Sequence, residues 1–161
     1  MMIQIEGTNI HVGGRGDSHV RTDPQWAVVN TAKTVHCEVM GWGSATPRDH
    51  PNYLSYEDGQ FLSFNWVDGK AFLYNMSGPA AFTRALNFID HWSSAGKKVL
   101  INCDLGQSRS PTLALLHLAK RQHLISDGSF AAARVEFQTL YPPYAPSGIA
   151  EFVSSHWEEI T

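Results

Sequence analysis

The segment from residue 99 to residue 111 reads VLINCDLGQSRSP. Its apolar start, Val99 to Ile101, is typical of a buried strand, and the leucine-rich stretch from Pro111 to Gln122 predicts a helix with a broad apolar face. The residues between them, Cys103 to Arg109, therefore form a strand-to-helix turn. Gly106 lies inside this turn, where it permits a close backbone approach and a positive φ.

A turn of this kind suits an anion, because backbone N–H groups and the positive end of a helix converge on one point. Cys103 lies at its centre, and the amides together with Arg109 favour the thiolate, which is the nucleophilic form. The guanidinium of Arg109 can hold two phosphoryl oxygens at once. A lone buried cysteine is usually only a small apolar side chain, but here strand, glycine, spacing, serine and helix occur together. The pattern therefore favours a phosphate or sulfate cradle around a nucleophile.

The same segment resembles the signature loop of cysteine-based protein tyrosine phosphatases, whose usual form is His-Cys-x-x-Gly-x-x-Arg followed by Ser or Thr. Its Ser-Arg-Ser-Pro ending, residues 108–111, is most similar to the dual-specificity branch. The resemblance to small bacterial and phage-type members covers most of residues 26–157. Outside the loop it is carried by Tyr53 to Tyr56, Leu62 to Gly69, Ala80 to Trp92, and Tyr141 to Pro146.

The resemblance implies attack of the Cys103 thiolate on a phosphate monoester and a phosphocysteine intermediate. The implied phosphate-binding loop consists of Cys103, Asp104, Leu105, Gly106, Gln107, Ser108 and Arg109. Ser110 would donate a hydrogen bond to the leaving sulfur, and capping of the following helix is its alternative role.

This chemistry needs a carboxylic acid that protonates the leaving oxygen and later activates water. In the resembled family the acid is an Asp on a loop before the signature, and Asp68 is the matching candidate; a turn residue before Gly69 is the structural alternative. Asp58 is explained by a hairpin turn, Asp90 by the solvated face of a helix, and Asp104 lies within the loop itself.

Two residues depart from the family pattern. Asn102 replaces the usual histidine before the nucleophile, in a supporting position. An amide replaces the hydrogen bonds of histidine but not its charge, so we expect slower turnover near pH 6. Asp104 places an acid in the loop; we expect its side chain at the mouth, where it repels strongly anionic substrates. The loop has no lysine, which disfavours inositol lipids.

The composition sets outer bounds. The chain has 161 residues, 43% of them hydrophobic, which fits a single domain over 1–161 with a peripheral segment over 1–25. A net charge of −3 and a pI near 6.2 do not indicate a basic surface that would bind nucleic acid or anionic membranes. Residues 1–5 lack the features of a secretion signal, and no apolar run is long enough to cross a bilayer.

Cysteine and histidine usage points to a cofactor-free protein of a reducing cytoplasm. The two cysteines, Cys37 and Cys103, form no disulfide framework, and Cys37 is interpreted as a structural thiol. The eight histidines show no metal-ligand spacing, so no metal or other cofactor is expected. We expect a monomer.

The pattern of elements predicts an α/β fold in which a central, mostly parallel sheet is flanked by helices on both faces, similar to dual-specificity phosphatases. Edge strands are expected at 3–5 and 10–12, a loop at 13–17, and a loop that could border the pocket at 41–51. Further strands are expected at 26–30, 53–56, 60–64 and 99–102, and helices at 79–94, 111–123, 130–140 and 149–157.

The favoured function is hydrolysis of phosphotyrosine in proteins, with phosphoserine and phosphothreonine left open. A phosphate-recognising module that has lost turnover is one alternative, and an enzyme acting on a small non-protein phosphomonoester is another. An arsenate reductase or sulfurtransferase with a similar loop is disfavoured by the position of the loop and by the missing resolving cysteines. The acidic charge balance disfavours an RNA 5′-phosphatase. Ser147 is a weaker candidate for a pocket residue.

Overall fold

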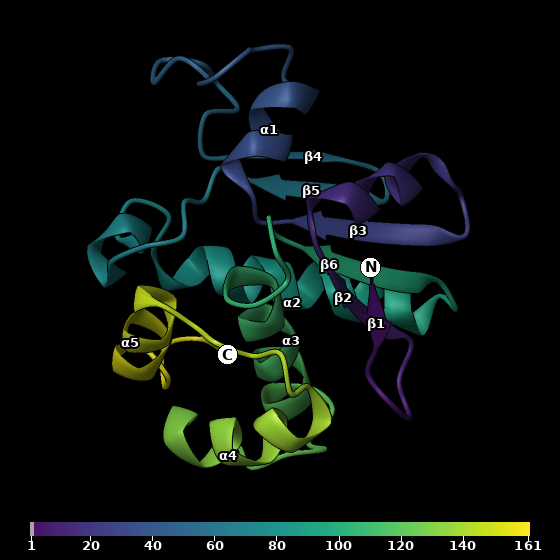
Figure 1. Cartoon of the computed structure of the whole chain (residues 1–161), viewed down its shortest axis with the longest axis vertical. Helices are drawn as coiled ribbons and strands as arrows, with labels where there is room; N and C mark the ends of the chain where they lie inside the picture. Colours follow the sequence, from purple (N-terminus) through teal and green to yellow (C-terminus); the bar gives the residue numbers. More distant parts are fainter. Residues whose placement is uncertain (1) are drawn as a thin grey trace.

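The computed structural model describes residues 2–161 and has a six-stranded sheet at its centre (Figure 1). The strand order is β1-β2-β6-β3-β5-β4. The strands are β1 (Ile3–Gln4), β2 (Ile10–Gly13), β3 (Trp26–Asn30), β4 (Ser55–Asp58), β5 (Phe61–Phe64) and β6 (Lys98–Asn102). Pairing is parallel from β2 through β6 and β3 to β5, and antiparallel only where β1 and β4 join the edges. The mostly parallel α/β sheet expected from the sequence is confirmed.

The inner strands are apolar because helices cover both of their faces. Val28 and Val29 of β3 and Leu100 and Ile101 of β6 alternate in direction, yet all four are fully buried. Because β6 lies between β2 and β3, its carboxyl end, where Cys103 follows, is enclosed by the ends of two parallel neighbours.

One face of the sheet carries the main core. It is covered by α2 (Gly78–Ser94) and α3 (Arg109–Lys120), with α4 (Phe130–Leu140) and α5 (Gly148–Ser155) packed outside them (Figure 1). The opposite face is covered by η1 (Arg15–Thr22) and α1 (Lys33–Val39), over a small cluster around Val28, Phe61 and Leu100. Helices thus lie on both faces, as predicted.

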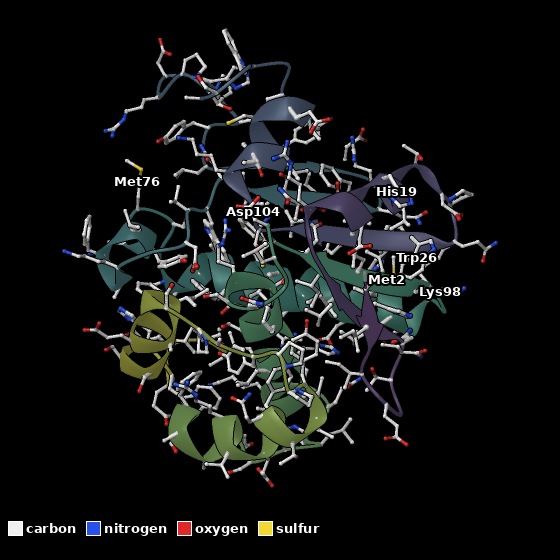
Figure 2. All side chains as sticks on the ribbon, in the orientation of Figure 1. Met2, His19, Trp26, Met76, Lys98 and Asp104 are labelled. Carbon is white, nitrogen blue, oxygen red and sulfur yellow. The ribbon has the colours of Figure 1, made fainter. Side chains whose placement is uncertain are left out.

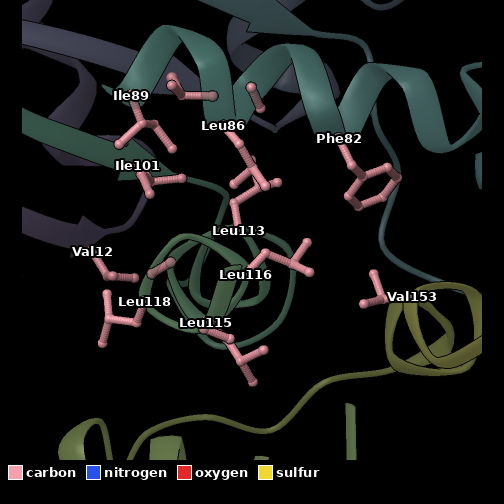
Figure 3. Packing of buried hydrophobic residues seen from close by; sticks show 14 of the residues in the cluster. Val12, Phe82, Leu86, Ile89, Ile101, Leu113, Leu115, Leu116, Leu118 and Val153 are labelled. Atoms are coloured by element: carbon pink, nitrogen blue, oxygen red, sulfur yellow. The ribbon is translucent and has the colours of Figure 1, made fainter. Parts of the chain in front are cut away.

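Helix α3 is buried almost all round, which fixes the position of its first turn. Viewed along its axis, its leucines radiate in different directions: Leu113 points toward Leu86 of α2 and Leu118 toward Val12 of β2 (Figure 3). Only the last residue of this helix, Lys120, is partly exposed. Packing along the whole length of α3 therefore fixes the position of Arg109, its first residue.

The structure corrects several expectations. The segment 10–12 is an inner strand rather than an edge, because β2 pairs with both β1 and β6, and Ile10 and Val12 are fully buried. The N-terminal region is thus more integrated into the core than a peripheral segment would be. The loop expected at 13–17 leads into η1 at Arg15. Helices α1 and η2 (Ala71–Tyr74) were not predicted, because both are short and lack a sustained apolar period.

A buried histidine lies between α2 and α3. His117 of α3 is 1% exposed, and its Nδ1 lies 3.4 Å from Oδ1 of Asp90, which also pairs with Arg121. Burial lowers the pKa of His117 to about 4, although the charge of Asp90 acts in the opposite direction. The folded protein therefore holds this imidazole neutral under conditions in which the unfolded chain protonates it.

We predict that His117 makes the fold acid-sensitive. Between the unfolded pKa of about 6.5 and the folded pKa of about 4, the unfolded state binds the extra proton, so stability falls as the pH falls through this window. From about pH 7 to about pH 5, His117 should account for a loss of about 2 kcal/mol. The variant His117→Gln, which has no charged form, should lose less stability than the wild type over this step. Urea titrations at the two pH values measure the difference, and equal losses would contradict the account.

Candidate active site

Cys103 follows the carboxyl end of β6 and is buried. Its backbone N–H donates to the carbonyl of Gly13 at 3.3 Å, which ties it to the end of the neighbouring strand β2. Its Sγ lies 3.2 Å from the N–H of Gly106 and 3.1 Å from Oγ of Ser110. The sulfur is therefore approached by one backbone amide and one hydroxyl, both of which can donate to a thiolate.

The loop after Cys103 is held from outside through its carbonyl groups. Asp104 accepts from the N–H of Arg15 at 2.9 Å, Gly106 from the hydroxyl of Tyr141 at 2.6 Å, and Gln107 from the N–H of Ala145 at 2.8 Å. In a planar trans peptide the carbonyl and the next N–H point in opposite directions. The N–H groups of residues 105, 107 and 108 therefore point away from these outer segments.

Gly106 is required by the geometry of the loop. Its φ is +74°, and an added Cβ would lie 3.1 Å from the carbonyl carbon and oxygen of Gly13. A side chain would meet both a disfavoured backbone region and a crowded contact with backbone atoms. This confirms the structural role that the sequence assigned to this residue.

The guanidinium of Arg109 is buried and fixed along one edge. Its Nη1 donates to the carbonyls of Thr31 at 3.1 Å and Trp66 at 2.7 Å. Its Nε is buried and has no hydrogen-bond partner among the described residues. Nε and Nη2 together form the edge that can hold two oxygens of a phosphoryl group.

Asp104 does not extend freely into the mouth, which corrects the orientation expected from the sequence. Its Oδ2 pairs with Nη2 of Arg109 at 2.9 Å, and its Oδ1 accepts from the Thr34 hydroxyl at 2.6 Å. It lies centrally, below α1 in the view of Figure 2. Partial burial acts to raise the pKa of Asp104, but the hydrogen bonds from Thr34 and Arg109 and the Arg109 charge outweigh it and lower the pKa. The carboxylate therefore competes with any anion for Arg109.

Asp68 lies beside the loop, as its candidate role requires. Its Oδ1 accepts from Oγ of Ser108 at 2.8 Å and from Oγ of Ser147 at 2.5 Å, and the N–H of Ser147 donates to the Ser108 hydroxyl at 3.0 Å. Ser147, the weaker sequence candidate, thus joins the site.

The other candidate acids lie elsewhere. Asp58 ends β4 and contacts Tyr56, while Asp90 pairs with Arg121. Leu105 and Gln107 have exposed side chains and contribute to the loop through their backbone.

Comparison with known proteins shows the family of the chain. A family model described as "Dual specificity phosphatase, catalytic domain" matches residues 47–138, which is more than half of the chain. The chain belongs to the dual-specificity phosphatase family. No curated protein matches it in a sequence search.

Solved structures of dual-specificity and related phosphatases share the fold. Human DUSP28 is 16% identical with a TM-score of 0.63, covering 98% of this chain and 93% of that chain. The Cydia pomonella PTP-2 phosphatase is 21% identical with a TM-score of 0.62, covering 96% and 88%. A leucine-rich repeat and phosphatase domain protein from Entamoeba histolytica is 19% identical with a TM-score of 0.62, covering 99% and 92%.

In this dual-specificity phosphatase family member, Asn102 begins a chain of buried hydrogen bonds that sequence reasoning missed. Its Nδ2 donates to Oδ1 of Asn30 at 2.9 Å, and Nδ2 of Asn30 donates to Oγ of Ser63 at 3.0 Å. Ser63 lies 2.7 Å from Nδ1 of His36, whose Nε2 lies 2.8 Å from the carbonyl of Asn52. The only sequence signal was a set of polar residues ending or flanking apolar strands.

The partners of His36 in this hydrogen-bond chain determine which ring nitrogen carries the proton. The carbonyl of Asn52 can only accept, so Nε2 of His36 carries a proton; in the neutral imidazole Nδ1 then accepts from the Ser63 hydroxyl. Burial lowers the pKa of His36, in agreement with this state. The chain thus connects the residue before the nucleophile to Asn52 in the loop that follows α1.

We predict that Asp104 weakens anion binding. Asp104→Asn keeps the shape of the side chain but removes a charge that pairs with Arg109 and repels a phosphate dianion. The affinity for inorganic phosphate should rise about tenfold, a moderate value because Asp104 is partly exposed and screened. Calorimetric titration with phosphate measures this, and Asp58→Asn provides a matched control outside the site. Weaker binding by Asp104→Asn would show instead that the carboxylate is needed to position Arg109.

We predict that Ser63 is essential to the buried chain of hydrogen bonds that runs from Asn102 to Asn52. Ser63→Ala leaves Nδ1 of His36 without a donor and removes one acceptor of Asn30, so the free energy of unfolding should fall by about 1–3 kcal/mol. The matched control Ser154→Ala, on the exposed side of α5, should stay within about 0.5 kcal/mol of the wild type. Urea denaturation compares the three proteins, and a Ser63→Ala protein as stable as the control would refute the role.

Proposed function

We propose that the protein hydrolyses phosphotyrosine in proteins through a phosphocysteine intermediate, and accepts phosphoserine and phosphothreonine as further substrates. The observation that carries the proposal is the convergence on Cys103 of the Gly106 amide and the Ser110 hydroxyl, in a loop whose last residue, Arg109, keeps a buried Nε without a partner among the described residues. A nucleophile and the donors for the group it attacks are thereby brought to one point. The free thiols of Cys37 and Cys103 favour the cytoplasm as its compartment.

In the first step, the Cys103 thiolate attacks phosphorus and the bond from phosphorus to the ester oxygen breaks. Asp68 gives its proton to the leaving oxygen. Both serine hydroxyls that contact Asp68 bind the same oxygen, Oδ1, which leaves Oδ2 to carry that proton. Nε and Nη2 of Arg109 hold two oxygens of the phosphoryl group during the transfer.

In the second step, water attacks the phosphocysteine and the bond from phosphorus to sulfur breaks. Asp68, now a carboxylate, takes the proton of the attacking water. The Ser110 hydroxyl donates to the leaving thiolate at the distance of 3.1 Å already present in the structure. Phosphate then leaves, and the proton held by Asp68 restores the starting state.

A second candidate is a phosphate-recognising module with little turnover. The pairing of Asp104 with Arg109 and the replacement of the usual histidine by Asn102 both favour it, because each reduces the positive potential around Cys103. The complete set of Cys103, Arg109 and Asp68 favours the enzyme, since binding alone has no use for a nucleophile and an acid.

Steady-state hydrolysis of p-nitrophenyl phosphate and of a phosphotyrosine peptide tests the proposal. Cys103→Ser should abolish turnover, and Asp68→Asn should lower kcat by roughly 10²–10⁴, because the leaving oxygen is no longer protonated. Asp58→Asn, a carboxylate outside the site, should match the wild type. Wild-type protein that binds the phosphotyrosine peptide without hydrolysing it would favour the module, and a Cys103→Ser protein that keeps its rate would exclude a phosphocysteine.

A further inference from the structure

Four cations of this acidic chain make no ion pair or side-chain hydrogen bond among the described residues, although Arg15 acts through its charge on Asp104. Most other lysines and arginines are engaged: Arg84 pairs with Glu57, Arg121 with Asp90, and Lys98, Lys120 and Arg134 lie over aromatic rings. Within residues 2–161, by contrast, no ion pair or side-chain hydrogen bond is made by Arg15, Lys33, Arg48 and Lys70. Lys97 is also unpaired, but it lies before β6, at the opposite end of that strand from Cys103.

Backbone contacts place two of these cations next to the loop that follows Cys103. Arg15 donates its N–H to the carbonyl of Asp104, and the N–H of Lys33 donates to the Trp66 carbonyl that also binds Arg109. Lys70 follows Asp68 by two residues. Glu38 lines a hollow together with Arg15 and Lys33, and Glu151 lines another with Lys70.

A groove with a volume of about 430 Å³ lies between the segment before β4 and η2, and no acidic side chain among the described residues lines it. Lys33 and Arg48 line it, and Val67, next to the proposed acid Asp68, connects it to the site. Among the described residues, eleven large apolar side chains are exposed and five of them line this groove: Leu54, Val67, Phe72, Leu73 and Met76. Met76 projects from the molecule at the left of Figure 2. Apolar surface gathered in this way marks a binding site more often than scattered single residues do.

We propose that this groove binds the polypeptide of a phosphoprotein substrate beside the phosphorylated residue, with an acidic side chain at Lys33 and Arg48 and an apolar side chain on Val67, Leu73 and Met76. The inference rests on the proposed function and names its substrate class. A small phosphomonoester would leave the groove unused. A nucleic acid binds by stacking its bases on aromatic rings, whereas most of the exposed apolar side chains here are aliphatic. An acidic and apolar peptide complements both the charge and the lining.

The test compares kcat/KM for two phosphotyrosine peptides, one flanked by Glu and Leu and one flanked by Lys and Ser, with p-nitrophenyl phosphate as reference. The wild type should prefer the Glu and Leu peptide. The double variant Lys33→Gln with Arg48→Gln should lower kcat/KM for that peptide about tenfold more than for p-nitrophenyl phosphate, and added salt should reduce the preference. Met76→Ser should act in the same direction.

Lys97→Gln is the matched control, because it removes an equally unpaired cation far from the groove; it should keep the wild-type preference. Equal losses on peptide and p-nitrophenyl phosphate in the double variant, or no preference in the wild type, would overturn the proposal. A 5′-phosphorylated oligoribonucleotide hydrolysed in preference to both peptides would overturn it as well.

Different results would refute the proposed function and the proposed role of the groove. Absence of turnover on every substrate would refute the enzyme but not the groove, which is then measured as affinity of the Glu and Leu phosphopeptide for the Cys103→Ser protein by fluorescence anisotropy. The double variant should weaken that affinity about tenfold. Unchanged affinity would refute the groove whatever the activity.

Discussion

The site depends on the outward hydrogen bonding of one short loop. Three carbonyls after Cys103 are bound by Arg15, near the start of the chain, and by Tyr141 and Ala145, in the loop between α4 and α5. Because each carbonyl is held on the outside, the following amide must face the inside. The surface that we propose for anion binding is therefore produced by contacts on the opposite side of the loop. These amides need little reorganisation when charge develops, which is the property that makes such a site effective.

Burial of Arg109 requires that its charge is compensated by neighbouring groups. Arg109 is nearly inaccessible to solvent, and a buried guanidinium without partners would be costly. Thr31 and Trp66 satisfy one end of it and Asp104 the other, while Nε stays unpaired. Arg109 and Asp104 together are close to neutral, and a phosphoryl group that binds Nη2 of Arg109 would displace part of this ion pair.

The sequence allowed the fold class and the central loop to be predicted, because both depend on local patterns. The apolar strand β6, the helix α4 and the hairpin of β4 and β5 follow from periodicity and turn residues. Asp68, Ser110 and Gly106 were found from spacing and family resemblance. The structure brings Ser110 and Gly106 to Cys103 and Asp68 to Ser108 of the same loop, and their catalytic roles stay predictions.

The remaining features arise from contacts between distant residues, which no local pattern records. Helix α3 begins at Arg109, two residues earlier than expected, because Pro111 sits inside its first turn rather than at its start. The orientation of Asp104 depends on Thr34, seventy positions away in sequence. The chain from Asn102 to His36 joins β6, β3, β5 and α1, so it exists only once the sheet has formed.

The covalent state of Cys103 during turnover tests the central claim most directly. Rapid acid quenching of the protein with p-nitrophenyl phosphate, followed by mass spectrometry of its peptides, reports which residue carries a phosphoryl group. The account predicts one phosphoryl group on the peptide that contains Cys103, accumulating further in Asp68→Asn if water attack becomes limiting, and none in Cys103→Ser. Turnover by the wild type with no phosphoryl group on that peptide at any quench time, or with the group on another residue, would contradict it.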